Sequence, residues 1–158
     1  MSIKIKKTGY INGTLTDEAH REITYSGTYI HIKDVQKGCA FIANKIIEAG
    51  INHDDTKMTI DNVNFAIEEG KTGISVKDGE WYKSHIENNR HHFYQHDNLD
   101  DCNLIDVIEA IVDCVMAAKA RRGQSAKMSA DFISPELLAK AFKNTVEMLE
   151  NEIIVEDE

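Results

Sequence analysis

The spacing of apolar residues along the chain predicts helices for most of its length. From about Thr28 to Ile47, apolar residues recur every three or four positions, which is the period of one helix face, and Gly50 follows as a stop. Similar spacing predicts shorter helices over residues 59–69 and 81–89. Glycines mark the loops between these segments.

Two further helices are predicted in the second half of the chain. Residues 103–120 are almost all apolar and lead into two arginines and Gly123, a pattern typical of a helix C-terminus. We therefore expect a central, buried helix there. The last helix is predicted to begin with Ser134 as its N-cap and Pro135 in its first turn, and to continue to residue 149.

These patterns predict an all-α fold. The chain has 158 residues, is 42% hydrophobic and contains one proline, which suits a single compact domain of roughly five or six helices. We expect that domain to cover residues 28–149. Residues 1–27 are expected to form an N-terminal arm or a short β-hairpin that turns at Asn12-Gly13, and residues 150–158 to form an acidic tail that frays.

Charge and composition exclude several classes of protein. The chain carries 27 acidic and 18 basic residues, a formal net charge of -9, which opposes binding to nucleic acids and to anionic membranes. No apolar run reaches the length of a membrane span, and the N-terminus lacks a signal-peptide core, so we expect a cytoplasmic protein with no DNA-binding patch. Cys39, Cys102 and Cys114 have no metal-ligand spacing and are expected to be small core residues.

Histidines are concentrated in one part of the chain. Six of the seven lie between His31 and His96, and neutral imidazoles and carboxylates are preferred ligands of divalent metals. An isolated histidine such as His20 or His96 is more often a capping or surface residue. The residues that could meet at one metal site are His31 at the start of the first long helix, His53 and Asp54 just past its end, His85, His91 and His92 before the central helix, and Asp113 within it.

Three carboxylates share one face of the predicted central helix. Asp106, Glu109 and Asp113 are spaced i, i+3 and i+7. A solvated stripe on an amphipathic helix is one interpretation. The apolar residues that crowd the three carboxylates favour the other interpretation, in which they are partners of a cation.

Four basic residues are candidates for binding a phosphate group. Arginines that follow a helix more often compensate its dipole or add solubility, so both roles stay open for the pair after the central helix. The four candidates are Lys57, Arg90, Arg121 and Arg122.

The order of these residues resembles a known signature. His31, then His53-Asp54, then Asp113 resembles the H…HD…D pattern of the HD-domain metal-dependent phosphohydrolases, an all-helical superfamily. The string HDDTK, residues 53–57, is similar to the HDxGK form, in which the histidine and aspartate bind metal and the lysine lies beside the scissile phosphate. The resemblance further implies that His85 and one of His91 or His92 complete a second metal site.

A longer segment is similar to an uncharacterised phage and bacterial HD-like family. Residues 85–119 match its N-x-HH segment, its D-[IV]-[IV]-E stretch and its D-W-x-x-A helix, and the combined resemblance runs from about residue 28 to 149. The chain departs from these patterns at Thr56, where the HDxGK form has glycine, and at Cys114, where the family has tryptophan. It has no GYP element, which removes the case for cyclic-di-GMP. For the terminal aspartate, the setting VDCVMAAKA favours Asp113 over Asp106.

The resemblance implies a metal-dependent phosphohydrolase in a bacterial or phage-infected host cytosol. One or two divalent ions (Mn, Fe, Co, Mg or Zn) would activate water to attack a phosphate mono- or diester, with a nucleotide as the favoured small phosphorylated substrate. Asp54 would bridge the ions, Lys57 would offset charge on the phosphate, and Glu109 would orient a ligand histidine.

Two other functions stay open at this point. One is a catalytically silent HD-like protein that binds a nucleotide or a host partner. The other is an all-α NTP pyrophosphohydrolase with carboxylate-only magnesium sites, because Glu109 and Asp113 match the ExxxD spacing of its helix.

Overall fold

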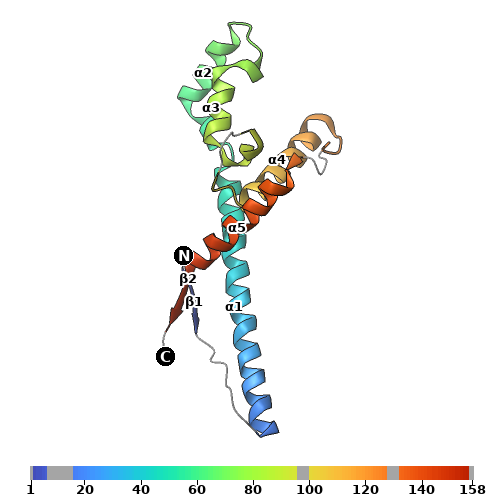
Figure 1. The fold of residues 1–158 in the computed structure, drawn as a ribbon. Helices are drawn as coiled ribbons and strands as arrows, with labels where there is room; N and C mark the ends of the chain where they lie inside the picture. Colours follow the sequence, from blue (N-terminus) through green and yellow to red (C-terminus); the bar gives the residue numbers. More distant parts are fainter. Residues whose placement is uncertain (1, 7–15, 96–99, 128–131, 157–158) are drawn as a thin grey trace. The chain divides into compact units, whose positions relative to one another are not determined.

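The computed structural model describes residues 2–6, 16–95, 100–127 and 132–156, and it is mostly helical, as the all-α prediction requires (Figure 1). In chain order, the elements are β1 (Ile3–Lys6), α1 (Asp17–Asn52), the 3-10 helix η1 (Asp55–Met58), α2 (Ile60–Gly70), the 3-10 helix η2 (Val76–Asp78), α3 (Glu80–Asn88), the 3-10 helix η3 (Arg90–Gln95), α4 (Leu104–Arg122), α5 (Pro135–Glu152) and β2 (Ile153–Glu156). Among the described helices, none combines the length and the apolar character that a bilayer span needs.

The chain divides into two compact units. Unit 1 comprises Met1–Lys45 and Val146–Glu158, and unit 2 comprises Ile46–Thr145. The boundaries between the units fall inside α1 and α5, so they do not coincide with the segments predicted from sequence. Both boundaries lie within regular helices, so no loop or turn in the sequence marks them.

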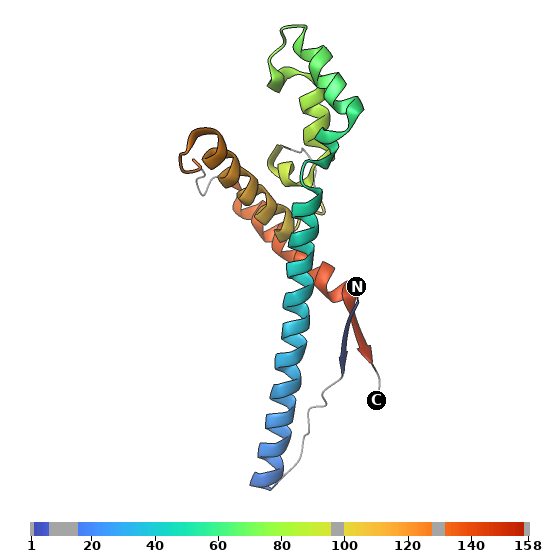
Figure 2. The same ribbon diagram turned by 180° about the vertical axis from the view of Figure 1, so that it is seen from behind.

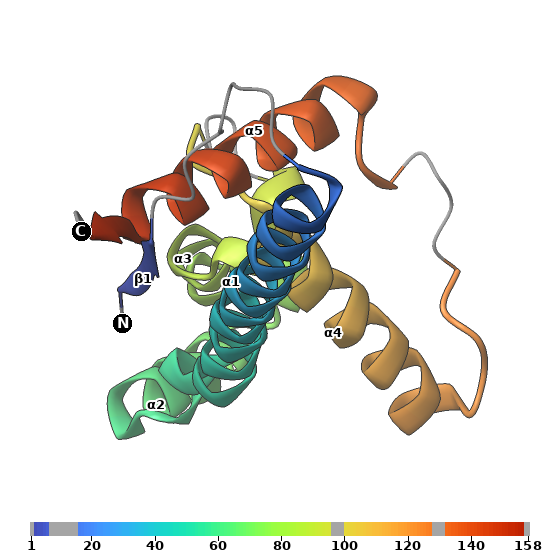
Figure 3. The ribbon, with the colours of Figure 1, turned by 90° about the horizontal axis from the view of Figure 1, so that it is seen from below.

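Helix α1 is longer than its apolar spacing predicts. It begins at Asp17, where Thr16 Oγ1 accepts a hydrogen bond from the Ala19 N–H at 3.4 Å and acidic residues occupy the first turn. Figure 3 shows α1 as one unbroken helix. The predictions that the helix starts near Thr28 and stops at Gly50 are therefore wrong, and His31 lies inside the helix rather than at its start.

Unit 1 contains a small parallel sheet made from both ends of the chain. Strands β1 and β2 lie side by side, with Ile3 opposite Ile153 (Figure 1). The Lys37 Nζ donates to the Lys4 carbonyl at 2.7 Å, which ties β1 to α1. The tail therefore continues α5 and then forms a strand instead of fraying. The predicted hairpin turn at Asn12-Gly13 lies outside the described residues.

Side-chain caps begin two helices of unit 2, and the sequence predicts the one at Ser134. Thr59 Oγ1 accepts from the Asn62 N–H ahead of α2, and Ser134 Oγ accepts from the Leu137 N–H ahead of α5. Helices α2 and α3 lie against each other (Figure 2). Gly123 ends α4 with φ of 61°, a left-handed conformation that glycine adopts at little cost.

The core of unit 2 covers only part of α4. Its buried residues are Phe93, Cys102, Val107, Ala110 and Ala141, so the first turns of α4 are covered. Further along α4, Ala118 is buried, but the large apolar residues Ile111, Val112, Val115 and Met116 are exposed. The prediction of a central buried helix is therefore wrong for these four positions. The predicted core role holds for Cys102, but Cys39 is exposed and Cys114 is only half-buried.

Asp106 is a structural residue at the start of α4. Its carboxylate is 4% exposed, accepts hydrogen bonds from Arg90 Nε and Nη2 at 2.9 and 2.8 Å, and accepts a third from the Asn103 N–H at 2.8 Å. Arg90 also donates to the exposed carboxylate of Asp101. This arrangement anchors η3 to the first turn of α4, because Arg90 belongs to one element and Asp106 to the other.

Replacing Asp106 with alanine should lower the free energy of unfolding by about 3 kcal/mol, because it leaves the Arg90 guanidinium without its buried partner and removes a cap. The matched change Asp101→Ala removes an exposed partner of the same guanidinium and should cost less than about 1 kcal/mol. Urea denaturation of both variants measures the difference. Equal losses at the two positions would contradict the structural role assigned to Asp106.

Candidate metal centre

Asp54 occupies a strained backbone position directly after α1. Its φ is 58° and its ψ is 15°, and it is the one non-glycine residue with positive φ among those the structure describes. Aspartate tolerates this left-handed conformation better than most residues because its side chain is short and polar. The turn aims the Asp54 carboxylate at residues from α3, η3 and η1. A strained residue whose side chain joins three elements is typical of a functional site.

Glu109 orients two of the imidazoles. Its Oε1 lies 2.9 Å from His53 Nδ1 and 3.1 Å from His91 Nδ1. A carboxylate only accepts, so each Nδ1 carries the donated proton and each neutral ring keeps an unprotonated lone pair on Nε2. His53 Nε2 lies 3.4 Å from Asp54 Oδ2 and 3.6 Å from Asp113 Oδ1. Carboxylates that fix the tautomer of metal-binding histidines in this way are common beside metal ions.

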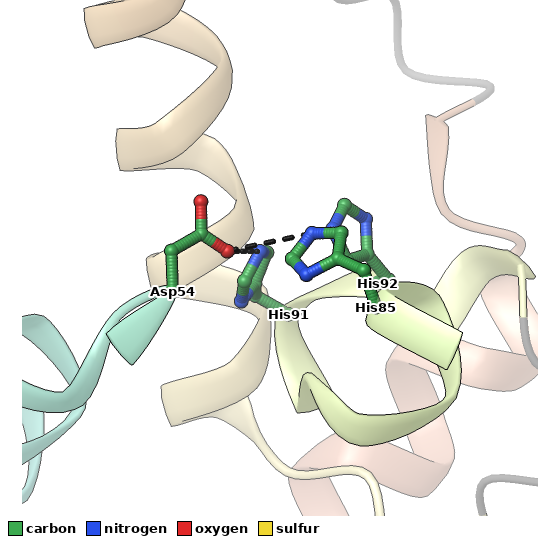
Figure 4. Close-up of side chains that lie close together, drawn as sticks. All are labelled: Asp54, His85, His91 and His92. Carbon is green, nitrogen blue, oxygen red and sulfur yellow. Dashed lines mark hydrogen bonds and ion pairs between the residues drawn. The ribbon is translucent and has the colours of Figure 1, made fainter. Parts of the chain in front are cut away.

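Two buried polar atoms of the cluster have no hydrogen-bond partner among the residues that the structure describes. They are Asp54 Oδ1 and His91 Nε2, which lie 3.6 Å apart. His85 Nε2 lies 3.4 Å from the same Asp54 oxygen (Figure 4). Leaving a buried acceptor unpaired costs roughly 1–3 kcal/mol, and a cation placed between these two acceptors could remove that cost.

The spacing of these atoms suits a metal ion. Two ligands held at about 2.1 Å from one ion lie about 3.0 Å apart at a right angle and about 3.4 Å apart at a tetrahedral angle. Two sets of ligand atoms lie within 4.8 Å of one another: one from Asp54, His85, His91 and His92, and one from His53, His91 and Asp113. The buried cluster could therefore hold a divalent cation.

His85 and His92 form a separate pair within the cluster. Their Nε2 atoms lie 2.8 Å apart, and the Asn89 amide nitrogen lies 2.9 Å from His85 Nδ1. With Asn89 as donor, the proton of neutral His85 is on Nε2 and is donated to His92 Nε2. A cation bound by both Nε2 atoms would displace that proton, whereas in His53 and His91 the nitrogen that donates to Glu109 is Nδ1, and Nε2 is the atom that could face a cation.

Burial and local charge shift the pKa values of the cluster. Burial, reinforced by the Lys57 charge, lowers the pKa of His85 to about 4, and burial with the neighbouring imidazoles of His91 and His85 lowers that of His92 to about 3. Burial by itself raises the pKa of Asp54, but the hydrogen bond and charge of Lys57 outweigh it, and the pKa of Asp54 is lowered. Lys57 Nζ donates to Asp54 Oδ2 at 2.6 Å.

Glu109 is balanced in the same way. Burial raises its pKa, while the hydrogen bonds from His91 and His53 lower it by more, so the pKa of Glu109 lies below its usual value. The cluster therefore combines anionic carboxylates with neutral His85 and His92 near pH 7, which is the protonation state that metal ligands need.

The structure does not bring every predicted residue to the cluster. His31 is exposed, belongs to unit 1, and is in neither set of potential ligands. Arg90 is engaged by Asp106 and Asp101. Arg121 lines an apolar groove between α1 and α4. The side chain of Arg122 and all of His96 lie outside the residues that the structure describes. His20 is exposed, and its Nδ1 lies near Thr24 Oγ1.

Sequence reasoning missed two residues that support the cluster. Asn89 contacts both His85 and Thr56, and Tyr94 Oη lies 3.5 Å from His92 Nδ1. The i+4 spacing of His85 and Asn89 on one helix face could have indicated the first contact. The second depends on the kink at His92 within η3, which has no sequence marker.

Comparisons with protein-family models, with curated proteins and with solved structures found no match to this chain. The geometry of the cluster is therefore the basis for the functional argument that follows.

The metal-free protein should lose stability as the pH falls from about 6.5. The folded-state pKa values of His85 and His92, about 4 and about 3, lie below the ordinary value of 6.5, so the unfolded chain takes up protons first. Their contribution is complete above pH 6.5 and is lost progressively below it. Thermal unfolding in EDTA between pH 7 and pH 5, above the range where carboxylates protonate, measures this decline.

His92→Asn should make that decline shallower, because one imidazole no longer titrates, whereas His20→Asn changes an exposed histidine and should leave the decline as it is. A melting temperature that stays constant from pH 7 to pH 5 in the wild-type protein would show that the two imidazoles are not held neutral.

Proposed function

We propose that this chain is a metal-dependent phosphohydrolase of the HD type, which cleaves a phosphate ester with water. The observation that carries the proposal is the pair of unsatisfied buried atoms, Asp54 Oδ1 and His91 Nε2, beside imidazoles already oriented by Glu109. The order of these residues in the chain, with Lys57 after the His53-Asp54 pair, supports the same assignment by its resemblance to HDxGK.

The ligand set we propose is His53, His91, Asp54 and Asp113, with His85 and His92 available to a second ion. Mixed imidazole and carboxylate donors suit Mn, Fe, Co or Zn better than a site built from oxygen alone. A divalent cation there supplies the Lewis acidity that activates water and polarises a phosphoryl oxygen. Asp54 presents Oδ1 towards His85 and His91 and Oδ2 towards His53, which supports a bridging role.

Lys57 is the proposed charge partner of the phosphate. Its ammonium contacts Asp54 Oδ2 and lines a polar cavity of about 270 Å³ together with His85 and Trp81. In hydrolysis, a water oxygen forms a bond to phosphorus while the ester P–O bond breaks and the leaving oxygen takes a proton. Negative charge grows on the phosphoryl oxygens as this happens, and a neighbouring ammonium stabilises it.

The carboxylate-only pyrophosphohydrolase has less support. Its ExxxD helix needs Glu109 and Asp113 as free metal ligands, but Glu109 accepts hydrogen bonds from His53 and His91. The four histidines of the cluster also have no role in such a site.

Mn²⁺ at about one hundred times its dissociation constant should raise the melting temperature of EDTA-treated protein by roughly 5–10 °C, since binding contributes about 2.7 kcal/mol at that ratio. Asp54→Asn keeps a residue that tolerates the left-handed backbone but removes the charge, and it should abolish the shift. Asp55→Asn makes the same change at the neighbouring exposed residue and should retain it. Differential scanning fluorimetry with elemental analysis tests this, and a full shift in Asp54→Asn would reject the site.

Lys57→Met should lower kcat for phosphate ester hydrolysis by roughly 10²–10³-fold while the metal content stays at the wild-type level, because the lysine stabilises charge on phosphate. The control Lys77→Met removes a lysine from η2 and should leave turnover unchanged. A panel of phosphomonoesters, phosphodiesters and nucleotides with Mn²⁺, Co²⁺ or Mg²⁺ provides the assay. Absence of turnover on all of them by metal-loaded protein would favour the silent binding protein instead.

A further inference from the structure

An apolar groove opens beside the metal cluster within unit 2. It has a volume of about 460 Å³ and lies between the last turns of α1 and the length of α4. His53, Glu109 and Asp113 line it as well as belonging to the cluster, so the groove is continuous with the candidate site. Its size falls within the usual range for small-molecule sites, roughly 300–1,000 Å³, whereas the polar cavity beside Lys57, at about 270 Å³, lies just below it.

The chemistry of the groove is aliphatic. Ile46, Ile108, Val112 and Met116 form its walls, and small residues such as Ala117 leave it open. Val112 is 53% exposed and Met116 is 62% exposed, so these side chains are not covered by the rest of the described chain. No phenyl, phenol, indole, amide or hydroxyl side chain lines the groove among the described residues.

This lining does not suit a nucleobase. Proteins recognise bases by stacking them on aromatic rings or guanidinium planes and by hydrogen bonds to their edges. Of the polar lining, His53 and Asp113 are proposed metal ligands and Glu109 accepts from His53, so only Arg121 is left for a base, and the aliphatic walls supply neither interaction. A hydrocarbon chain needs only apolar surface and gains about 0.8 kcal/mol for each buried CH₂ group. The groove therefore favours an aliphatic organic group over a nucleoside.

Spacing along α4 sets the length of the occupant. The groove lining follows α4 from Ile105 to Arg121, with the proposed metal ligand Asp113 midway, and Arg121 lies eight residues beyond Asp113, about 12 Å away at the helical rise. Arg121 lines the end of this stretch of the groove and is exposed, so the apolar lining ends there. An extended chain of roughly eight to ten carbons spans this length at about 1.2 Å per bond.

We propose that the groove between α1 and α4 binds the hydrocarbon chain of an aliphatic phosphate ester, with the phosphate at the metal cluster. The inference rests on the proposed phosphohydrolase function and names its substrate class. It replaces the nucleotide expected from the sequence resemblance with an amphiphilic monoester or diester whose chain follows α4 towards Arg121.

Binding of alkylphosphonates, which cannot be hydrolysed, tests the proposal without requiring turnover. Isothermal titration of the full-length, Mn²⁺-loaded protein should show affinity rising about threefold to fourfold for each added CH₂ from methylphosphonate to octylphosphonate, the fold-change that corresponds to about 0.8 kcal/mol. AMP should bind no more tightly than methylphosphonate, because the aliphatic walls of the groove neither stack on its base nor hydrogen-bond to it.

Met116→Glu should weaken octylphosphonate binding by at least about tenfold and leave methylphosphonate binding unchanged, since a carboxylate in the groove opposes only the chain. Ile47→Glu is the matched control: Ile47 is 57% exposed on α1, outside the groove. It should bind both phosphonates as the wild type does. Because Met116 is exposed, its replacement should not prevent folding, and the unfolding midpoint checks this.

The outcomes separate this inference from the proposed function. If methylphosphonate binds but chain length has no effect, or AMP binds more tightly than octylphosphonate, the aliphatic assignment is overturned and the phosphohydrolase proposal stands. If no phosphonate binds and no ester is hydrolysed, both are overturned. If sedimentation shows that Met116→Glu dissociates an oligomer that Ile47→Glu preserves, the groove is covered by a second copy, which also overturns the assignment.

Discussion

Glu109 Oε1 accepts hydrogen bonds from the Nδ1 atoms of both His53 and His91, and the geometry of the candidate site depends on this shared acceptor. His53 follows α1, His91 lies in η3 and Glu109 lies in α4, so one oxygen joins three elements. The same two bonds assign a tautomer to each ring and leave both Nε2 lone pairs facing the Asp54 carboxylate. The interaction that joins these elements of unit 2 therefore also orients the two rings that could bind a metal ion.

The charges of the cluster would be offset by a bound cation. Asp54, Glu109 and Asp113 bring three carboxylates, and Lys57 brings one ammonium. Burial lowers the pKa values of His85 and His92, so these two rings add no positive charge near neutral pH. Partly buried anions are stable when paired, and we propose that a divalent ion completes the pairing. The adjacent apolar groove would then hold the remainder of the molecule whose phosphate approaches that ion.

Local rules were enough to predict part of this structure. The cap at Ser134 and the glycine at residue 123 each act over a few residues, so the start of α5 and the end of α4 could be predicted from the sequence. The His53-Asp54 pair and the preference for Asp113 over Asp106 also followed from sequence, and the structure brings Asp113 near His53 while Arg90 engages Asp106.

Other features depend on contacts between distant residues. The parallel pairing of Ile3 with Ile153 joins opposite ends of the chain, and no local pattern marks it. The resemblance to the H…HD…D pattern predicted His31 as a metal ligand from its order in the sequence alone. In the structure, α1 continues unbroken past His31, and His31 belongs to neither set of potential ligands. Apolar spacing alone did not predict the start of α1, because the helix begins at the capping residue Thr16 and the acidic Asp17.

Anomalous diffraction from crystals grown with Mn²⁺ tests the metal assignment most directly, because it locates the ion without requiring a substrate. We expect a peak bonded to Asp54 Oδ1 and His91 Nε2, at about 2.0–2.3 Å from each, with His53 and Asp113 among the neighbouring ligands. An anomalous map with no peak at this cluster, in crystals where Asp54 Oδ1 and His91 Nε2 are instead satisfied by ordered water, would contradict the account.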